Sequence, residues 1–282
     1  MNDKVITSYK AFDKNMKCRD FQYEVGKEYE MDGEIKCCNR GFHACKSPME
    51  VWDYYDMLNS RYAEVEQSGK IDKEGNSTKV CSSHIKIKAE LKLADIIKVG
   101  VEWLKDITSP SKVKTDDALS SSGYYAQIGS SGDYAQIGSS GDDAKIDSSG
   151  DDAKIGSSGD DAKIGSSGDS AKIGSSGDYA QIGSSGNSAK IGSSGYSAQI
   201  GSSGYSAKID STGEDSVIMC AGNSSIAKAK VGSWITLAEW KWSDEKNHDV
   251  PVCVKTEYVD GENIKADTWY QLRNGKFVEV QK

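Results

Sequence analysis

The sequence lacks the features that mark membrane, secreted and collagen-like proteins. It has only 3 prolines against 29 glycines, which excludes collagen and proline-rich linkers. No apolar run approaches the roughly 18 residues of a membrane-spanning helix. The first residues, MNDKVITSYKAFDK, contain no apolar stretch of the kind found in a secretory signal. These absences predict a cytoplasmic protein with no membrane partner.

Regularly spaced cysteines and excess positive charge are also missing. The 7 cysteines are odd in number and follow no disulfide-framework spacing, which favours reduced thiols. The net charge of −8 argues against direct nucleic-acid binding. With 37% hydrophobic residues, a chain of 282 residues has too little apolar material for one large core, so another kind of order must hold much of it.

Familiar catalytic and cofactor motifs are absent as well. The chain contains no G-x-S-x-G, no H-E-x-x-H, no Walker loop and no Rossmann glycine pattern, and it has only 3 histidines. The sequence therefore favours a protein that is not an enzyme and carries no cofactor.

What the chain does contain is a nonapeptide repeat, G-S-S-G-x-x-A-[KQ]-I. Isoleucine recurs every nine residues from Ile128 to Ile218, and alanine precedes it by two positions through most of the array. This alternation is typical of a short strand, while G-S-S-G favours a turn with positive φ. We predict a parallel β-solenoid with two repeats in each 18-residue coil rather than three in 27. About ten repeats would then give about five coils and a rod about 25 Å long.

The flanking segments predict two further domains and a mainly β fold class. We expect an α+β domain over 1–110, the β-solenoid over 111–231 with repeats at 119–218 followed by a cap, and a small β-rich domain over 232–282. The N-terminal domain is predicted to contain strands at 41–45 and 61–66 around a serine-capped helix at 47–55, and an amphipathic helix at 89–104.

The C-terminal domain alternates apolar and polar residues like antiparallel strands. We predict strands at 233–242, 251–259, 269–272 and 277–280, with Asp260-Gly261 and Asn274-Gly275 as hairpin turns. Exposed solenoid ends leave unpaired strand edges, so we also expect caps and a homo-oligomer.

The variable repeat positions predict an exposed acidic binding surface. Stacked coils display each position as a ladder with a rung about every 4.8 Å, and neighbouring carboxylates then need lysines or a cation to offset their repulsion. The period matches that of calcium-binding β-rolls, but G-S-S-G replaces their turn, so we expect no calcium. The residues of this surface are Asp133, Asp142, Asp143, Asp151, Asp152, Asp160, Asp161, Asp169, Asp178, Tyr124, Tyr125, Tyr134 and Tyr179.

A cluster of cysteines and a histidine near the N-terminus offers the soft ligands that zinc prefers. Cys18, Cys37, His43 and Cys45 are the candidate set, with Cys38 beside them. Because the spacing is not C-x-x-C, we favour buried structural thiols and no metal.

The order of RGFHAC, SPMEVWDYY and RYAEVEQSG, preceded by SYKAF, resembles the core of small ADP-ribosyltransferase-like domains. The resemblance implies NAD contacts and acid–base chemistry at His43, Tyr54, Tyr55, Glu64 and Glu66. The chain departs from the pattern because no His-Gly-Thr element follows its first strand.

Both ends of the chain resemble an uncharacterised family found in phages and prophages. The matching motifs are FDKNMKCRDFQYEVGKEYE, CCNRGFHACKSPMEVWDYY, GSWITLAEW and DTWYQLRNGKFVEV, with nonapeptides between them. The resemblance implies a viral accessory protein in the host cytoplasm. Within that setting the acidic solenoid predicts an inhibitor or decoy of a host defence protein. An ADP-ribosyltransferase-like enzyme and a virion component are the alternatives.

Overall fold

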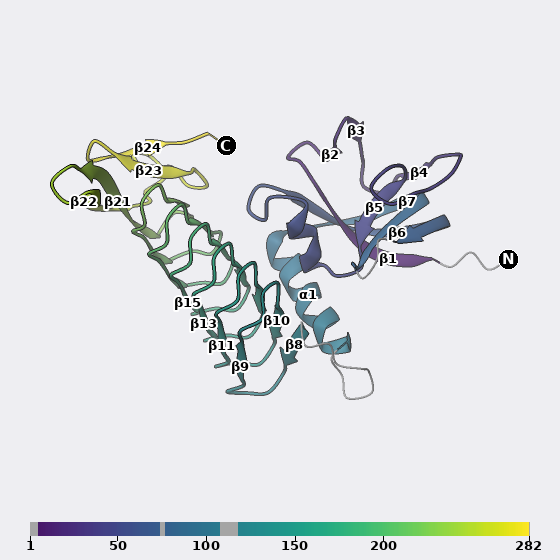
Figure 1. The fold of residues 1–282 in the computed structure, drawn as a ribbon, viewed down its shortest axis with the longest axis horizontal. Coiled ribbons are helices and arrows are strands. Elements are labelled where there is room, and N and C mark those ends of the chain that lie inside the picture. Colours follow the sequence, from purple (N-terminus) through teal and green to yellow (C-terminus); the bar gives the residue numbers. More distant parts are fainter. Residues whose placement is uncertain (1–4, 74–76, 108–117, 282) are drawn as a thin grey trace. The chain divides into compact units, whose positions relative to one another are not determined.

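The computed structural model describes residues 5–73, 77–107 and 118–281 (Figure 1). The chain divides into two compact units, Met1–Trp103 and Leu104–Lys282. Within the described residues, no helix is both long and apolar enough to cross a membrane.

The N-terminal unit is built on a small, closed antiparallel sheet. Strands β1, β6, β7 and β5 pair in a ring, and β4 extends it by pairing with β7. A two-stranded ribbon, β2 with β3, follows β1. The strand bounds are β1 Ile6–Phe12, β2 Lys17–Cys18, β3 Phe21–Gln22, β4 Glu28–Glu30, β5 Phe42–Cys45, β6 Arg61–Lys73 and β7 Lys79–Leu91.

Two helical segments accompany this sheet, and both differ from the sequence prediction. The helix predicted at 47–55 is a single 3₁₀ segment, η1 (Met49–Asp53). The helix predicted at 89–104 begins only at Leu93, because β7 continues to Leu91, and α1 then runs from Leu93 to Ile107. A side chain at Gly100 would approach Met49 to 2.9 Å, so α1 packs closely against η1.

The second unit is the predicted parallel β-solenoid. Its strands alternate between two sheets, and Ile137 pairs with Ile155 eighteen residues later, which confirms two nonapeptides per coil. The even sheet contains β8 Ala118–Ser121, β10 Gln136–Ser139, β12 Lys154–Ser157, β14 Lys172–Ser175, β16 Lys190–Ser193, β18 Lys208–Ser211 and β20 Ile226–Lys228. The odd sheet contains β9 Gln127–Ser130, β11 Lys145–Ser148, β13 Lys163–Ser166, β15 Gln181–Ser184, β17 Gln199–Ser202, β19 Val217–Cys220 and β21 Trp234–Ser243.

The solenoid has about seven coils rather than the predicted five. The difference arises because the count of about ten repeats left out the two ends of the array, Leu119 in β8 and Ile218 in β19, and because β20 and β21 also stack in register although their sequences depart from the repeat. Two antiparallel additions, β22 (His248–Tyr258) and β23 (Tyr270–Arg273) with its partner β24 (Lys276–Glu279), extend the same two sheets. No break in the described sheets falls at the predicted boundary of residue 232, and the predicted boundary at 110 lies outside the described residues.

The core of the solenoid is the narrow interior that the repeat predicted. Ile155, Ile173 and Ala171 are fully buried, and Ile164 is 3% exposed. The first serine of each G-S-S-G, such as Ser157, also points inward because it is the fourth residue of its strand.

Turn geometry corrects the roles expected of the glycines. The second glycine of G-S-S-G is required by stacking: a Cβ on Gly168 would lie 2.0 Å from the carbonyl oxygen of Gly150 in the preceding coil. The positive φ falls instead on the residue before alanine, for example Asp152 (φ 54°) and Ser188 (φ 57°).

At the C-terminus, Asn274-Gly275 forms the predicted hairpin turn between β23 and β24, with φ values of 50° and 66°. Asp260-Gly261 does not form a hairpin. The Asp260 carboxylate instead accepts hydrogen bonds from the backbone N–H groups of Glu262, Asn263 and Ile264, which closes the loop between β22 and β23.

Candidate functional sites

The variable repeat residues lie on two separate edges of the solenoid, not on the single ladder predicted from the sequence. Because each coil contains two repeats, successive repeats alternate between edges. The turns that lead from the even to the odd sheet form the edge called here the acidic edge: Tyr124, Tyr125, Asp142, Asp143, Asp160, Asp161, Asp178, Tyr179, Tyr196, Glu214 and Asp215. The opposite, mixed edge carries Asp133, Tyr134, Asp151, Asp152, Asp169, Asn187 and Tyr205.

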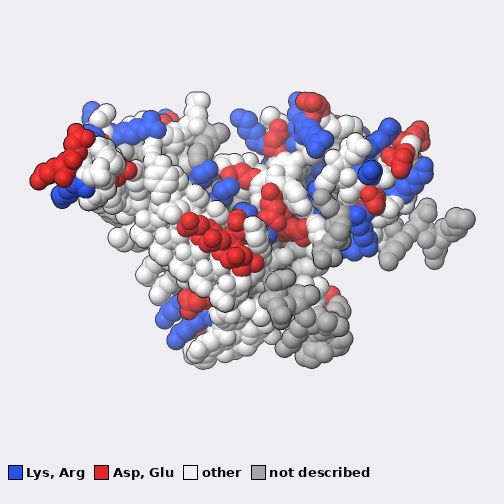
Figure 2. Space-filling model, viewed as in Figure 1, with Lys and Arg blue, Asp and Glu red and all other residues white. Residues whose placement is uncertain are grey.

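The stacked aspartates on both edges are held by backbone hydrogen bonds. On the acidic edge, the N–H of Asp160 donates to Asp142 Oδ1 (3.0 Å), and the N–H of Asp178 donates to Asp160 Oδ1 (2.8 Å). The mixed edge has the same ladder, and there Asn187 Oδ1 accepts from the N–H of Tyr205 at 3.0 Å. Amide dipoles therefore offset the repulsion between like charges, a role that the sequence had suggested for lysines or a cation. Figure 2 shows acidic side chains gathered in a row along the coils.

Exposed aromatic rings accompany the carboxylates. Tyr124 is 72% exposed, and Tyr179 and Tyr196 are also exposed on the acidic edge. The sequence predicted the exposure of Tyr124, Tyr125, Tyr134 and Tyr179. The predicted coil of two repeats already implied that they alternate between two edges, although the prediction treated them as one surface.

A cavity of about 760 Å³ lies in the N-terminal unit, lined by residues of β1, β2, β5 and β7. His43, Tyr54 and Tyr55 line it, as the ADP-ribosyltransferase-like resemblance implied. Burial, followed by the nearby charges of Lys10 and Lys79, lowers the pKa of His43, so its imidazole is neutral near pH 7.

The two glutamates of that resemblance do not line the cavity. Both lie on β6, where Glu66 Oε1 accepts from Lys88 Nζ at 2.8 Å and Glu64 pairs opposite Tyr9. Burial and then the Glu64 carboxylate raise the pKa of Tyr9. Among the described lining residues, Asp20 is the only carboxylate, so the cavity lacks an acid–base group at either implied position.

The cavity also contains cations that the sequence reasoning missed. Lys10 lies on β1, Lys79 begins β7, and Arg19 follows β2 with a φ of 55°. A usable signal was the lysine within SYKAF, because strand alternation places Lys10 on the same face as the buried Phe12.

The candidate zinc ligands separate in the structure. Cys45 is buried, and burial raises the pKa of its thiol. Cys18 faces the cavity, where its sulfur accepts from Tyr55 Oη (2.7 Å). Cys37 and His43 instead lie near Cys81, with their ligand atoms within 4.8 Å of one another.

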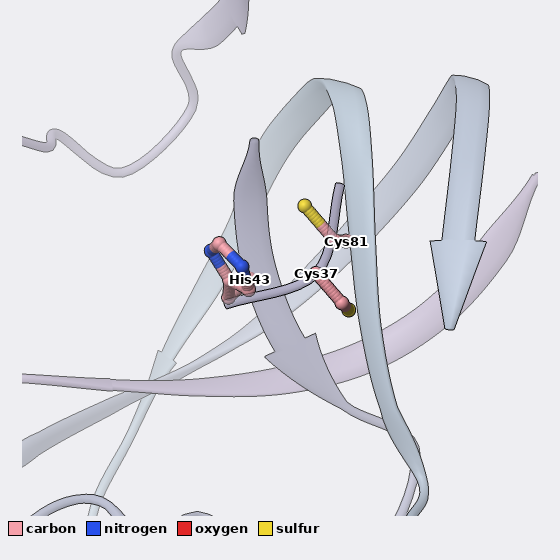
Figure 3. A group of neighbouring side chains, drawn as sticks. All are labelled: Cys37, His43 and Cys81. Atoms are coloured by element: carbon pink, nitrogen blue, oxygen red, sulfur yellow. The ribbon is translucent and has the colours of Figure 1, made fainter. Parts of the chain in front are cut away.

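This second group is not arranged as a preformed metal centre. His43 Nε2 already accepts from the N–H of Cys38 at 3.0 Å. Figure 3 shows the thiols of Cys37 and Cys81 pointing in opposite directions. A zinc ion with bonds of about 2.3 Å to sulfur would need both thiols to turn inward.

In the comparison with known proteins, a family model matches the N-terminal third of the chain. Residues 6–99 match a family described as Domain of unknown function (DUF7666). Neither a curated protein nor a solved structure matches the chain.

Proposed function

We propose that the chain is a phage-type accessory protein that binds a host protein through the acidic edge of its solenoid and acts as an inhibitor or decoy. The observation that carries this proposal is the concentration of charge and aromatic surface on one edge. Seven carboxylates gather there with four exposed tyrosines, whereas the mixed edge replaces acids by Asn187 and serines along its later coils.

The density of these carboxylates suits a target that normally binds nucleic acid. Where a coil carries two acids, as at Asp142-Asp143 and Asp160-Asp161, a rise of about 4.8 Å gives one charge per about 2.4 Å. Duplex DNA carries one charge per about 1.7 Å of its axis. The acidic edge therefore approaches the line charge of a duplex over the two coils that carry these pairs.

The hydrogen-bond ladder makes this surface rigid. Because Oδ1 of Asp142 and of Asp160 accepts from the next coil, each side chain is fixed with Oδ2 left to contact a partner. A surface that is already ordered loses little conformational entropy on binding. The flanking tyrosines supply the large, stiff contact area that dominates many protein interfaces.

The test makes the same substitution, Asp→Asn, on each of the two edges and compares the effects on binding. Asp→Asn at positions 142, 143, 160, 161 and 178 removes five charges from the acidic edge but keeps the acceptor oxygen, as Asn187 does naturally. The matched control carries Asp→Asn at 133, 151, 152 and 169 on the mixed edge. Each protein captures its partner from host lysate, and increasing amounts of duplex DNA are then added.

We expect wild type and the mixed-edge variant to retain one protein that duplex DNA displaces, and the acidic-edge variant to lose it. Equal capture by both variants would refute the acidic edge as the binding surface. A partner that DNA does not displace would refute the decoy mechanism. Sedimentation of the same samples measures the self-association that we also propose, and recovery of the chain in purified phage particles would favour the virion alternative.

A further inference from the structure

The side chain of Lys10 is a buried cation without a carboxylate partner. The residue is 4% exposed. Its Nζ donates to the backbone oxygen of His43 (2.9 Å) and to Cys18 Sγ (3.4 Å), and it lies over the rings of Phe12 and Tyr23 at 5.5 and 5.4 Å. Within the described residues, none of its contacts is an acid.

An ammonium in this position is costly unless something compensates it. Removing the charge from water costs several kcal/mol, which a carbonyl and a thiol offset only in part. Burial accordingly lowers the pKa of Lys10. The lysine also lines the cavity, so a small anion that enters can reach it.

The rest of the cavity wall favours the same kind of ligand. Arg19 and Lys79 add two cations against the single carboxylate of Asp20. Lys79 is fixed in place, since its Nζ lies 4.6 Å from the ring centre of Tyr54 and 2.9 Å from Cys38 Sγ.

The wall is also aromatic. Phe21, Tyr23, Tyr54 and Tyr55 all line the cavity, and such rings accept a planar group by stacking. The volume of about 760 Å³ lies within the range of small-molecule sites, which is about 300 to 1,000 Å³.

We propose that this cavity binds a nucleoside phosphate, whose phosphate is the counter-ion of Lys10 and whose base packs against the tyrosines. Inorganic phosphate shares only the anionic part of this chemistry. The two are therefore separated by measuring AMP and inorganic phosphate on the same protein. This site is independent of the acidic edge, so either proposal can fail alone.

The experiment measures binding to the full chain by calorimetry. We expect AMP to bind at least about 10-fold more tightly than inorganic phosphate, and Lys10→Met to weaken AMP by at least about 30-fold. The control is Lys88→Met, which removes a lysine that pairs with Glu66 outside the cavity and leaves AMP binding unchanged.

Two further readouts separate a binding role from a structural one. Without ligand, Lys10→Met melts at or above the temperature of wild type, because it removes an unpaired buried charge. Bound AMP slows the alkylation of Cys18 by iodoacetamide in wild type but not in Lys10→Met. Absence of AMP binding up to about 10 mM would overturn the proposal. Equal affinities for AMP and inorganic phosphate would overturn the assignment of the base to the tyrosines.

Discussion

The solenoid and the N-terminal unit differ in how the partners of a residue are distributed along the chain. In the solenoid, each residue of the stacked strands from β8 to β20 pairs eighteen positions away, and the same contact recurs from coil to coil. In the N-terminal unit, β1 pairs with β5 and β6 while β7 pairs with β4, β5 and β6 over unrelated separations. The residue type at a solenoid position is thus determined by the equivalent positions of the coils above and below it. In the N-terminal unit, the residue type depends on contacts that occur only once in the structure.

The two units also differ in how closely the residues that maintain the fold are linked to those of the candidate site. In the solenoid, the buried columns and the turn ladder are uniform, so the exposed edge residues can vary without changing the backbone. In the N-terminal unit, the residues that close the sheet are adjacent to those of the cavity. His43, for example, lies on β5, lines the cavity and accepts a backbone hydrogen bond.

Two glycines give the strongest test of the idea that a solenoid residue is governed by the equivalent residues stacked above and below it. Gly168→Ala places a Cβ 2.0 Å from a backbone oxygen and is expected to destabilise the solenoid by about 3 kcal/mol or more. A Cβ added at Gly183 would meet no atom within 4 Å, and this glycine has no positive φ, so Gly183→Ala should stabilise by about 0.5 kcal/mol. Calorimetric melting of the two variants measures both effects, and a similar loss at both glycines would contradict this idea.

A second prediction concerns the side chain of Gln67, whose hydrogen bonds in the N-terminal unit occur only once in the structure. Gln67 is fully buried; its Nε2 donates to Phe42 O (2.7 Å) and Ser82 Oγ (3.0 Å), and its Oε1 accepts from Ser8 Oγ (2.7 Å). Gln67→Leu leaves these groups unpaired and should cost about 2–3 kcal/mol. Gln181→Leu, at an exposed solenoid position, should change stability by less than about 0.5 kcal/mol in the same urea titration.

Asp210, a buried acid on the even sheet, should make the stability of the solenoid depend on pH. Burial raises the pKa of Asp210 from 3.8 to about 6, although Lys228 lies 2.9 Å away. Because the folded-state pKa is the higher one, the folded protein holds the proton more tightly than the unfolded chain. The contribution of Asp210 to the free energy of unfolding is therefore greatest below about pH 4 and falls by about 2–3 kcal/mol as the pH rises to about 6.

Asp210→Asn should remove this fall, as measured by urea unfolding between about pH 4 and 7. Asp147 occupies the same repeat position on the odd sheet but is exposed, so Asp147→Asn is the matched control and should leave the pH profile unchanged. If Asp210→Asn retained the wild-type slope, another group would be responsible for it.

The smallest expected effect concerns the turn ladder. Asp160→Ala removes the acceptor for the N–H of Asp178 and should cost about 1 kcal/mol. Asp160→Asn keeps an acceptor oxygen and should cost less than about 0.5 kcal/mol. Equal losses in thermal melts would mean that charge, rather than the hydrogen bond, holds the ladder.

The same contrast decides what could be predicted from the sequence. The nine-residue period predicted the buried isoleucines, the strands and the eighteen-residue coil because one local pattern is repeated with few changes. It could not predict the last coil, since Trp234 in β21 stacks on Val217 in register without matching the repeat. It also could not place the positive φ, because Asp and Ser as well as Gly tolerate that conformation.

Prediction of the N-terminal site was weaker for a physical reason. The ADP-ribosyltransferase-like resemblance implied a site with His43, Tyr54 and Tyr55, and these three residues line one cavity. Their association with Lys10 and Lys79 depends on the long-range pairing of β1, β5 and β7, which no local period encodes. Glu64 and Glu66 lie on the neighbouring strand β6 and do not line the cavity.

Two repeats in each coil impose a parity on changes in the length of the array. Loss of the single nonapeptide that carries Asp151 and Asp152 would move every later repeat to the opposite side, so that the acids before and after it, now in one file, would be divided between both. Loss of a pair would shorten the rod by one rung and leave both files intact. Variants that differ by an even number of nonapeptides should therefore share one binding surface, while an odd change would create a different protein from the same parts.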